Sequence, residues 1–158
     1  MKFILKAAIP TLLLLTFGTG VFADEATDKA AIRGVLTSYE KALNAADTAA
    51  IVDLYTVDGV QMAPDFPAAV GSKAVAAAYE GTFKAIDLKL TFSIDEVKLL
   101  GPDAALLRSH SNGTVKVNGS DQPAAPAAFK ELFLLARENG EQWKFTHYSF
   151  SAAPASGQ

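Results

Sequence analysis

The chain has 158 residues, half of them hydrophobic, with a formal net charge of −3 and no cysteine. This length is typical of one ordinary domain with enough residues for a core. The acidic balance and the lack of a basic run argue against nucleic-acid binding. Disulfides are excluded, so stability must come from packing.

The first 23 residues read MKFILKAAIPTLLLLTFGTGVFA and have the pattern of a secretory signal peptide. Lys2 and Lys6 precede an apolar run, and small residues lead to an expected cleavage after Ala23. The alternative is a membrane anchor, but the run is short and interrupted by Pro10, whereas a span needs roughly 20 apolar residues. We therefore expect a cleaved leader (1–23), a periplasmic or secreted protein, and no membrane association after cleavage.

Three helices are expected in the first half of the remaining chain. From Thr27 onward, apolar residues recur at helical spacing, at Ile32, Leu36, Tyr39 and Leu43. Asp47 is the expected N-cap of a second, short helix, because its carboxylate can accept from free amides of the first turn. Residues 57–71 indicate a strand, a Pro-rich turn and a return, and a third helix follows from Gly71-Ser72.

Four long strands should follow, because alternating, β-branched and aromatic residues dominate the rest of the chain. Asn118-Gly119 and Asn139-Gly140 are typical of tight turns. The pattern predicts an α+β fold, with three N-terminal helices packed on a curved, mostly antiparallel sheet. Residues 24–151 would form this single domain and 152–158 a flexible tail. The expected strands cover 88–100, 103–117, 127–137 and 142–151.

The last hairpin predicts which side chains share a sheet face. A two-residue turn at Asn139-Gly140 would pair Leu134 with Phe145 and so fix the register. The more uniformly apolar face, expected to meet the helices, carries Leu132, Leu134, Trp143, Phe145 and His147. The other face carries Glu131, Phe133, Leu135, Lys144, Tyr148 and Phe150. Because a lone domain should not expose such a patch, we expect a homodimer through this outer face, at Phe133, Leu135, Tyr148 and Phe150.

Five stretches of the sequence resemble the nuclear transport factor 2-like (NTF2-like) superfamily, and more closely its SnoaL-like (polyketide-cyclase-like) group. The resemblance implies a cone-shaped domain, a curved sheet around a long helix, with a pocket at the wide end. It implies no single activity, because the superfamily includes isomerases, cyclases, dehydratases, ligand binders and dimerisation modules. The matching stretches are YEKALNAAD (39–47), IVDLYTVDGVQMAP (51–64), VGSKAVAAAY (70–79), FSIDEVKLLGPDAALLRSHSNGTV (92–115) and ELFLLARENGEQWKFTHYSF (131–150).

The start of the domain is similar to that of ketosteroid isomerases, which use an aspartate base and an oxyanion hole of a tyrosine and a protonated aspartic acid. By this resemblance the tyrosine falls on Tyr39, and the base falls on Ala63, which cannot abstract a proton. The nearest acid to the third position is Glu131, which the expected register places on the outer face. With one of three groups retained, we do not expect the steroid-isomerase mechanism.

The candidate catalytic residues are His147, His110 and Tyr39. His147 on the expected inner face could act as a general base, or it could be a pocket-wall histidine. His110 shares a strand face with Arg108 and Asn112, and this trio could hold a carboxylate if it points inward. Tyr39 could donate to a ligand oxygen, or it could be a core tyrosine with a backbone partner.

We expect the ligand-binding residues to gather at the wide end of the cone. They are Tyr39, Tyr55, Met62, Phe66, Tyr79, Phe83, His110 and His147. Two histidines without cysteine are too few for a closed zinc shell, and no phosphate or dinucleotide motif is present, so we expect no metal and no cofactor.

The first hypothesis is therefore an exported protein that binds a small, largely apolar ligand in its cone pocket. One alternative is a SnoaL-like isomerase, cyclase or dehydratase that uses a pocket histidine. The other is a non-catalytic dimerisation or interaction module whose cone is filled by side chains.

Overall fold

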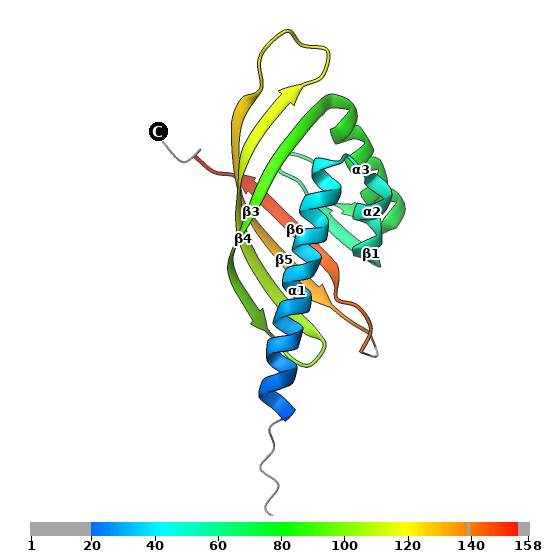
Figure 1. The fold of residues 1–158 in the computed structure, drawn as a ribbon. Helices are drawn as coiled ribbons and strands as arrows, with labels where there is room; N and C mark the ends of the chain where they lie inside the picture. Colours follow the sequence, from blue (N-terminus) through cyan, green and yellow to red (C-terminus); the bar gives the residue numbers. More distant parts are fainter. Residues whose placement is uncertain (1–19, 139, 155–158) are drawn as a thin grey trace, which may run out of the picture.

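The computed structural model describes residues 20–138 and 140–154, and in this part of the chain three helices pack on one side of a curved sheet (Figure 1). The helices are α1 (Gly20–Asn44), α2 (Thr48–Asp53) and α3 (Ser72–Ala85). The strands are β1 (Tyr55–Met62), β2 (Ala69–Val70), β3 (Ile86–Leu99), β4 (Ala104–Val117), β5 (Ala125–Ala136) and β6 (Lys144–Ala152). Their order is β2-β1-β6-β5-β4-β3, with β1 and β6 parallel and the other pairs antiparallel. The predicted α+β fold is confirmed.

Helix α1 lies along the concave side of the sheet and buries the face that its sequence predicts (Figure 1). The helix begins at Gly20, earlier than the predicted Thr27, so it includes 20–23 of the predicted leader. The rest of that leader lies outside the described residues. No helix within 20–154 is long and apolar enough to span a membrane. The buried residues of the predicted face are Ile32, Leu36, Tyr39 and Leu43.

The short helix α2 and the start of α3 also follow their sequence signals. The amide of Ala50 donates to Oδ1 of Asp47 at 3.0 Å, which confirms the predicted N-cap. Gly71 precedes α3 with a φ of 81°, a conformation that favours glycine, and its amide donates to the Gly59 carbonyl at 2.8 Å. This bond fixes α3 against β1.

Polar side chains of α1 form hydrogen bonds with the backbone of the edge strand β3. The side chain of Asn44 bonds both backbone groups of Leu90, at 2.7 and 2.8 Å. The Phe92 amide donates to Oε2 of Glu40 at 2.8 Å. An open edge would leave such backbone groups free for another chain, so these bonds both protect the edge and hold α1 across the sheet.

The hairpin turn and a bulge in β6 together change the predicted sheet faces. Leu135 pairs with Phe145, but Leu134 pairs with His147, so Thr146 is the extra residue. A bulge shifts the in–out alternation by one residue. The faces of β5 change for another reason: before the bulge, Leu135 and not the predicted Leu134 already pairs with Phe145. Phe133 is therefore fully buried, whereas Leu132 is 42% exposed. The predicted faces are wrong for β5 and, beyond the bulge, for β6.

This reversal also removes the predicted dimer surface. Phe133, Leu135 and Tyr148 are core residues of the monomer, and Phe150 packs against that core. They cannot form an exposed outer patch, so the predicted interface is wrong. The homodimer itself stays a prediction without an assigned surface.

The turns and the tail differ from expectation in detail. The amide of Ser120 donates to the Val117 carbonyl at 3.3 Å, so residues 117–120 form a turn, but only Gly119 has a positive φ and β5 begins five residues later. A similar bond joins the Glu141 amide to the Glu138 carbonyl at 2.8 Å. The pairing of β5 with β6 begins only at Ala136 and Lys144, so the connection is longer than the predicted two-residue turn. Strand β6 extends to Ala152, one residue into the predicted tail.

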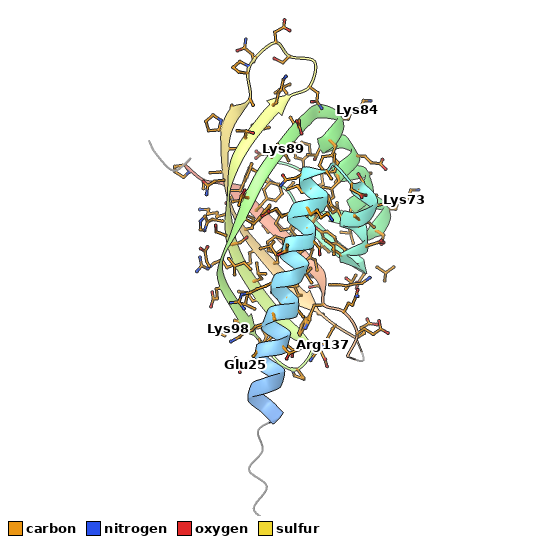
Figure 2. The ribbon with its side chains drawn as sticks, in the orientation of Figure 1. Glu25, Lys73, Lys84, Lys89, Lys98 and Arg137 are labelled. Carbon is orange, nitrogen blue, oxygen red and sulfur yellow. The ribbon has the colours of Figure 1, made fainter. Side chains whose placement is uncertain are left out.

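An ion pair closes the narrow end of the cone. Arg137, at the end of β5, bonds both carboxylate oxygens of Asp28 on α1, and its guanidinium lies 4.8 Å from the ring centroid of Trp143. Figure 2 shows Arg137 at the same end of the molecule as Glu25. This ion pair holds α1 against the sheet at the narrow end of the cone. A pocket inside the curve therefore opens at the opposite, wide end, near the β4–β5 connection.

Candidate functional site

Four buried tyrosines from four elements meet inside the curve of the sheet. They are Tyr39 of α1, Tyr55 of β1, Tyr79 of α3 and Tyr148 of β6. The Tyr79 hydroxyl lies 2.9 Å from that of Tyr39 and 3.2 Å from that of Tyr55. These hydroxyls thus form a hydrogen-bonded chain, the tyrosine chain, inside an aromatic core. The predicted inward placement of Tyr39, Tyr55 and Tyr79 is confirmed.

Glu131 lies inside the cone, which corrects its predicted outer position. Its side chain is only 3% exposed, and its two oxygens accept from the hydroxyls of Ser109 at 2.6 Å and Ser111 at 2.5 Å. Ser109 pairs directly with Glu131 across β4 and β5, so all three side chains share the inner face. The hairpin turn is the reason for the wrong prediction, because it pairs Leu135 and not Leu134 with Phe145, which places Glu131 on the inner face.

Burial changes the acid–base properties of this group of residues. Desolvation raises the pKa of Glu131, while the hydrogen bonds from Ser109 and Ser111 lower it and so offset part of the effect. Desolvation also raises the pKa of Tyr79 to about 12 and that of the other three tyrosines well above its ordinary value. At neutral pH the tyrosines therefore stay protonated, and Glu131 takes up a proton more readily than a surface glutamate.

A small cavity lies against these polar groups, and we call it the niche. It has a volume of about 50 Å³, and Glu131, Tyr39, Tyr79 and Tyr148 line it. It adjoins a larger pocket of about 640 Å³, the mouth, which α3, the loop after β1, and strands β3 to β6 enclose. Ligand pockets commonly measure about 300–1,000 Å³, so the mouth has room for a small molecule. Residues that line both are Gln61, Thr82, Leu88, Phe129 and Phe150.

Another surface depression, of about 720 Å³, lies at the narrow end of the cone. Charged and polar residues such as Asp58, Arg137 and Glu141 line it, and neither Glu131 nor any of the four tyrosines does so. An open, polar depression lacks the apolar enclosure typical of ligand sites. The niche and the mouth are therefore the candidate site.

Both histidines lie outside the cone, and their predicted inward placement is wrong. His147 follows the bulge and is exposed on the outer face. His110 is exposed because β4 buries the alternate positions Ser109 and Ser111, and its Nδ1 lies 2.8 Å from Oδ1 of Asp95. Neither histidine can reach a molecule in the niche from there.

The remaining predicted ligand residues are divided between the pocket and its surroundings. Phe66 lines the mouth, although 76% of it is exposed. Met62 is 38% exposed and does not line the niche or the mouth, and Phe83 packs against Tyr79 with ring centroids 5.9 Å apart. Ala63, at the position of the isomerase base, lines the mouth with only a methyl group.

Sequence reasoning missed Glu131, Ser109 and Ser111 as site residues. One signal was present in β4, where Arg108 and His110 occupy the even positions and Ala105 and Leu107 occupy the odd ones. That alternation indicates that the odd positions face the core. The two serines at odd positions are then inward polar groups, and such groups require a partner.

A curved sheet closed by helices around an apolar pocket, with one carboxyl at its inner end, defines a cone-shaped α+β domain. The chain belongs to the SnoaL-like domain family, whose model matches residues 35–148. This confirms the predicted resemblance. The comparison with curated proteins finds no match.

Solved structures show the same fold. The chain is 35% identical to a ketosteroid isomerase-like protein from Erwinia carotovora atroseptica SCRI1043, over 79% of this chain and 96% of that one, with a TM-score of 0.75. A putative scytalone dehydratase from Novosphingobium aromaticivorans DSM 12444 is 17% identical, over 84% and 89% of the two chains, with a TM-score of 0.72. The LinA-type3 hexachlorocyclohexane dehydrochlorinase of Novosphingobium barchaimii LL02 is 12% identical, over 87% and 96%, with a TM-score of 0.74. The last two support the fold alone.

Proposed function

We propose that this protein is an exported SnoaL-like protein that binds one small, largely apolar ligand in its cone pocket. The observation that carries the proposal is the mouth of about 640 Å³, which apolar side chains enclose and which leads to a buried carboxyl. Apolar pockets with a few placed polar groups are typical of small-molecule sites. Export rests on the leader pattern of residues 1–23.

The two parts of the pocket suit two parts of a ligand. The mouth presents Phe66, Phe129 and Phe150, which suit a hydrocarbon or aromatic body. The niche has a volume of about 50 Å³, and one water molecule accounts for about 30 Å³ of the liquid. The niche therefore admits a single small polar group, which would contact Glu131 and the tyrosines.

A second candidate function is acid–base catalysis in the same pocket, such as isomerisation, cyclisation or dehydration. Burial raises the pKa of Glu131, and a carboxyl with such a pKa is suited to proton transfer. The similar structures include a ketosteroid isomerase-like protein, a putative scytalone dehydratase and a dehydrochlorinase, which favour the same idea. We place it second because Glu131 is the only carboxyl among the described lining residues, and Ala63 replaces the expected base.

The proposal is tested by native mass spectrometry on the purified protein and on a variant whose mouth is filled. Ala78 lines the mouth on α3, and Ala78→Phe should fill part of it. Ala45→Phe is the matched control, because Ala45 is exposed and does not line the pocket. We expect added apolar probes to bind the wild type and Ala45→Phe, but not Ala78→Phe. Equal binding by all three proteins would refute the proposed site.

A further inference from the structure

Only one charged side chain lines the described part of the niche and the mouth. Among the described residues that line the niche and the mouth, Glu131 is the only one with a charged side chain. Lys73 and Lys84 of α3 point away from the sheet (Figure 2). An ionised Glu131 therefore has no cationic side chain beside it inside the cone.

The carboxylate has acceptor capacity that its serine partners do not use. Ser109 donates to one oxygen of Glu131 and Ser111 to the other. An ionised carboxylate offers about four acceptor sites, so about two remain. A primary ammonium group, with three donors and no acceptor, is the complementary ligand group.

The walls near the carboxyl are aromatic and continuous. The ring centroid of Tyr148 lies 5.6 Å from that of Tyr39 and 5.3 Å from that of Phe150, which in turn lies 5.8 Å from Phe129. Aromatic faces attract cations through their quadrupole. They give an anion no such stabilisation. The aromatic walls and the carboxylate therefore both favour a cationic ligand group.

We infer that the cone pocket binds small apolar primary amines as ammonium ions, with the –NH₃⁺ group in the niche at Glu131 and the hydrocarbon body in the mouth. This inference rests on the proposed function and specifies its ligand class. The niche of about 50 Å³ admits –NH₃⁺ but not a trimethylammonium group. An anionic ligand would meet the carboxylate without a cation to neutralise it.

The test is calorimetric titration of the full protein with three probes of similar shape at neutral pH. The probes are 2-phenylethylamine, which is protonated at this pH as primary amines are, the neutral 2-phenylethanol, and the trimethylammonium derivative of the amine. We expect the amine to bind at least about tenfold more tightly than the alcohol, because hydrogen bonds between charged groups are stronger than neutral ones. The trimethylammonium compound should bind more weakly than the amine. Glu131→Gln should remove the preference for the amine and keep the affinity for the alcohol.

The outcomes separate this inference from the proposed function. If the alcohol binds and the amine binds no better, the inference is overturned and the ligand pocket stands. If no probe binds and no bound mass is found, the proposed function fails as well. The comparison of probes on the wild type decides the inference even if Glu131→Gln does not fold.

Discussion

The hydroxyl of Ser111 lies 2.5 Å from Oε1 of Glu131, across two neighbouring strands and on the inner side of the sheet. This contact places a carboxyl where the sequence register had placed apolar residues. It also gives the pocket one titratable group at its inner end. The inward position of Glu131 follows from the pairing of Leu135 with Phe145 at the start of the hairpin.

The stability of the protein should depend on pH through Glu131. Burial raises its pKa in the folded state, so folding favours the protonated form, and this stabilising contribution is lost as the pH rises through the folded pKa. Glu131→Gln lacks this dependence. Its free energy of unfolding should therefore increase relative to that of the wild type as the pH rises from 4 toward 7. The groups near Glu131 are Tyr39, Tyr148, Ser109 and Ser111 inside the cone, and His110 and Asp95 on the other face.

Urea unfolding of both proteins at several pH values measures this difference. Contributions from His110, Asp95 and more distant groups largely cancel between the two proteins. A constant difference across the pH range would contradict the raised pKa.

The central hydroxyl of the tyrosine chain, that of Tyr79, should contribute more to the stability of the protein than a terminal one. Tyr79→Phe removes two hydroxyl contacts, those with Tyr39 and Tyr55, whereas Tyr55→Phe removes one. Losing a partner leaves a buried polar group unsatisfied at a cost of about 1–3 kcal/mol. The free energy of unfolding should therefore fall further for Tyr79→Phe than for Tyr55→Phe, and the reverse order in urea denaturation would refute the hydrogen-bonded chain.

The corrected sheet faces predict opposite results for one substitution at two nearby positions. Leu135 is 2% exposed, so Leu135→Ala should cost about 2–5 kcal/mol of stability. Leu132 is 42% exposed, so Leu132→Ala should cost less than about 1 kcal/mol. Chemical denaturation of both variants checks this, and the predicted pairing of Leu134 with Phe145 would require Leu132→Ala to be the more damaging change.

The two histidines should be dispensable for ligand binding. His110 and His147 are exposed on the outer side of the sheet, so replacing either with Ala should change probe affinity less than about twofold, which is below 0.5 kcal/mol. Tyr39→Phe, which removes a hydroxyl that lines the niche, should weaken the binding of the same probes. Calorimetry on the three variants decides this, and a large loss with His147→Ala would restore the histidine hypothesis.

The leader pattern predicts a mature protein that begins at Asp24. The small residues Val21 and Ala23 favour cleavage after Ala23. Intact-mass measurement of the exported fraction of expressing bacteria should give a chain of residues 24–158. A chain that retains Met1 and stays with the membranes would instead support an anchor.

The helices and the long strands could be predicted because each rests on a local pattern. Ile32, Leu36 and Tyr39 repeat at helical spacing, and Asp47 caps α2 as its side chain allows. The faces of β5 depend on the turn, which pairs Leu135 with Phe145. The faces of β6 beyond Phe145 depend on one extra residue, Thr146, whose hydroxyl bonds the Leu134 carbonyl at 3.2 Å. No local pattern marks that residue, because tertiary packing selects the bulge.

Only those residues of the candidate site whose position depends on a local sequence pattern were predicted correctly. Tyr39 and Tyr79 were placed correctly by helical period. Glu131 was misplaced because its face depends on the register at the hairpin turn, and His147 because its face depends on the bulge. The hydrogen bonds of Ser109 to Glu131 join two strands and become visible only when the register is known.

The most direct test of the account is to locate the bound probe by NMR. Titration of the isotope-labelled protein with 2-phenylethanol should give its largest amide shifts at Phe129, Glu131 and Phe150, which line the niche and the mouth. Shifts confined to residues of the depression at the narrow end, such as Asp58 and Glu141, would contradict the claim that the cone pocket is the binding site.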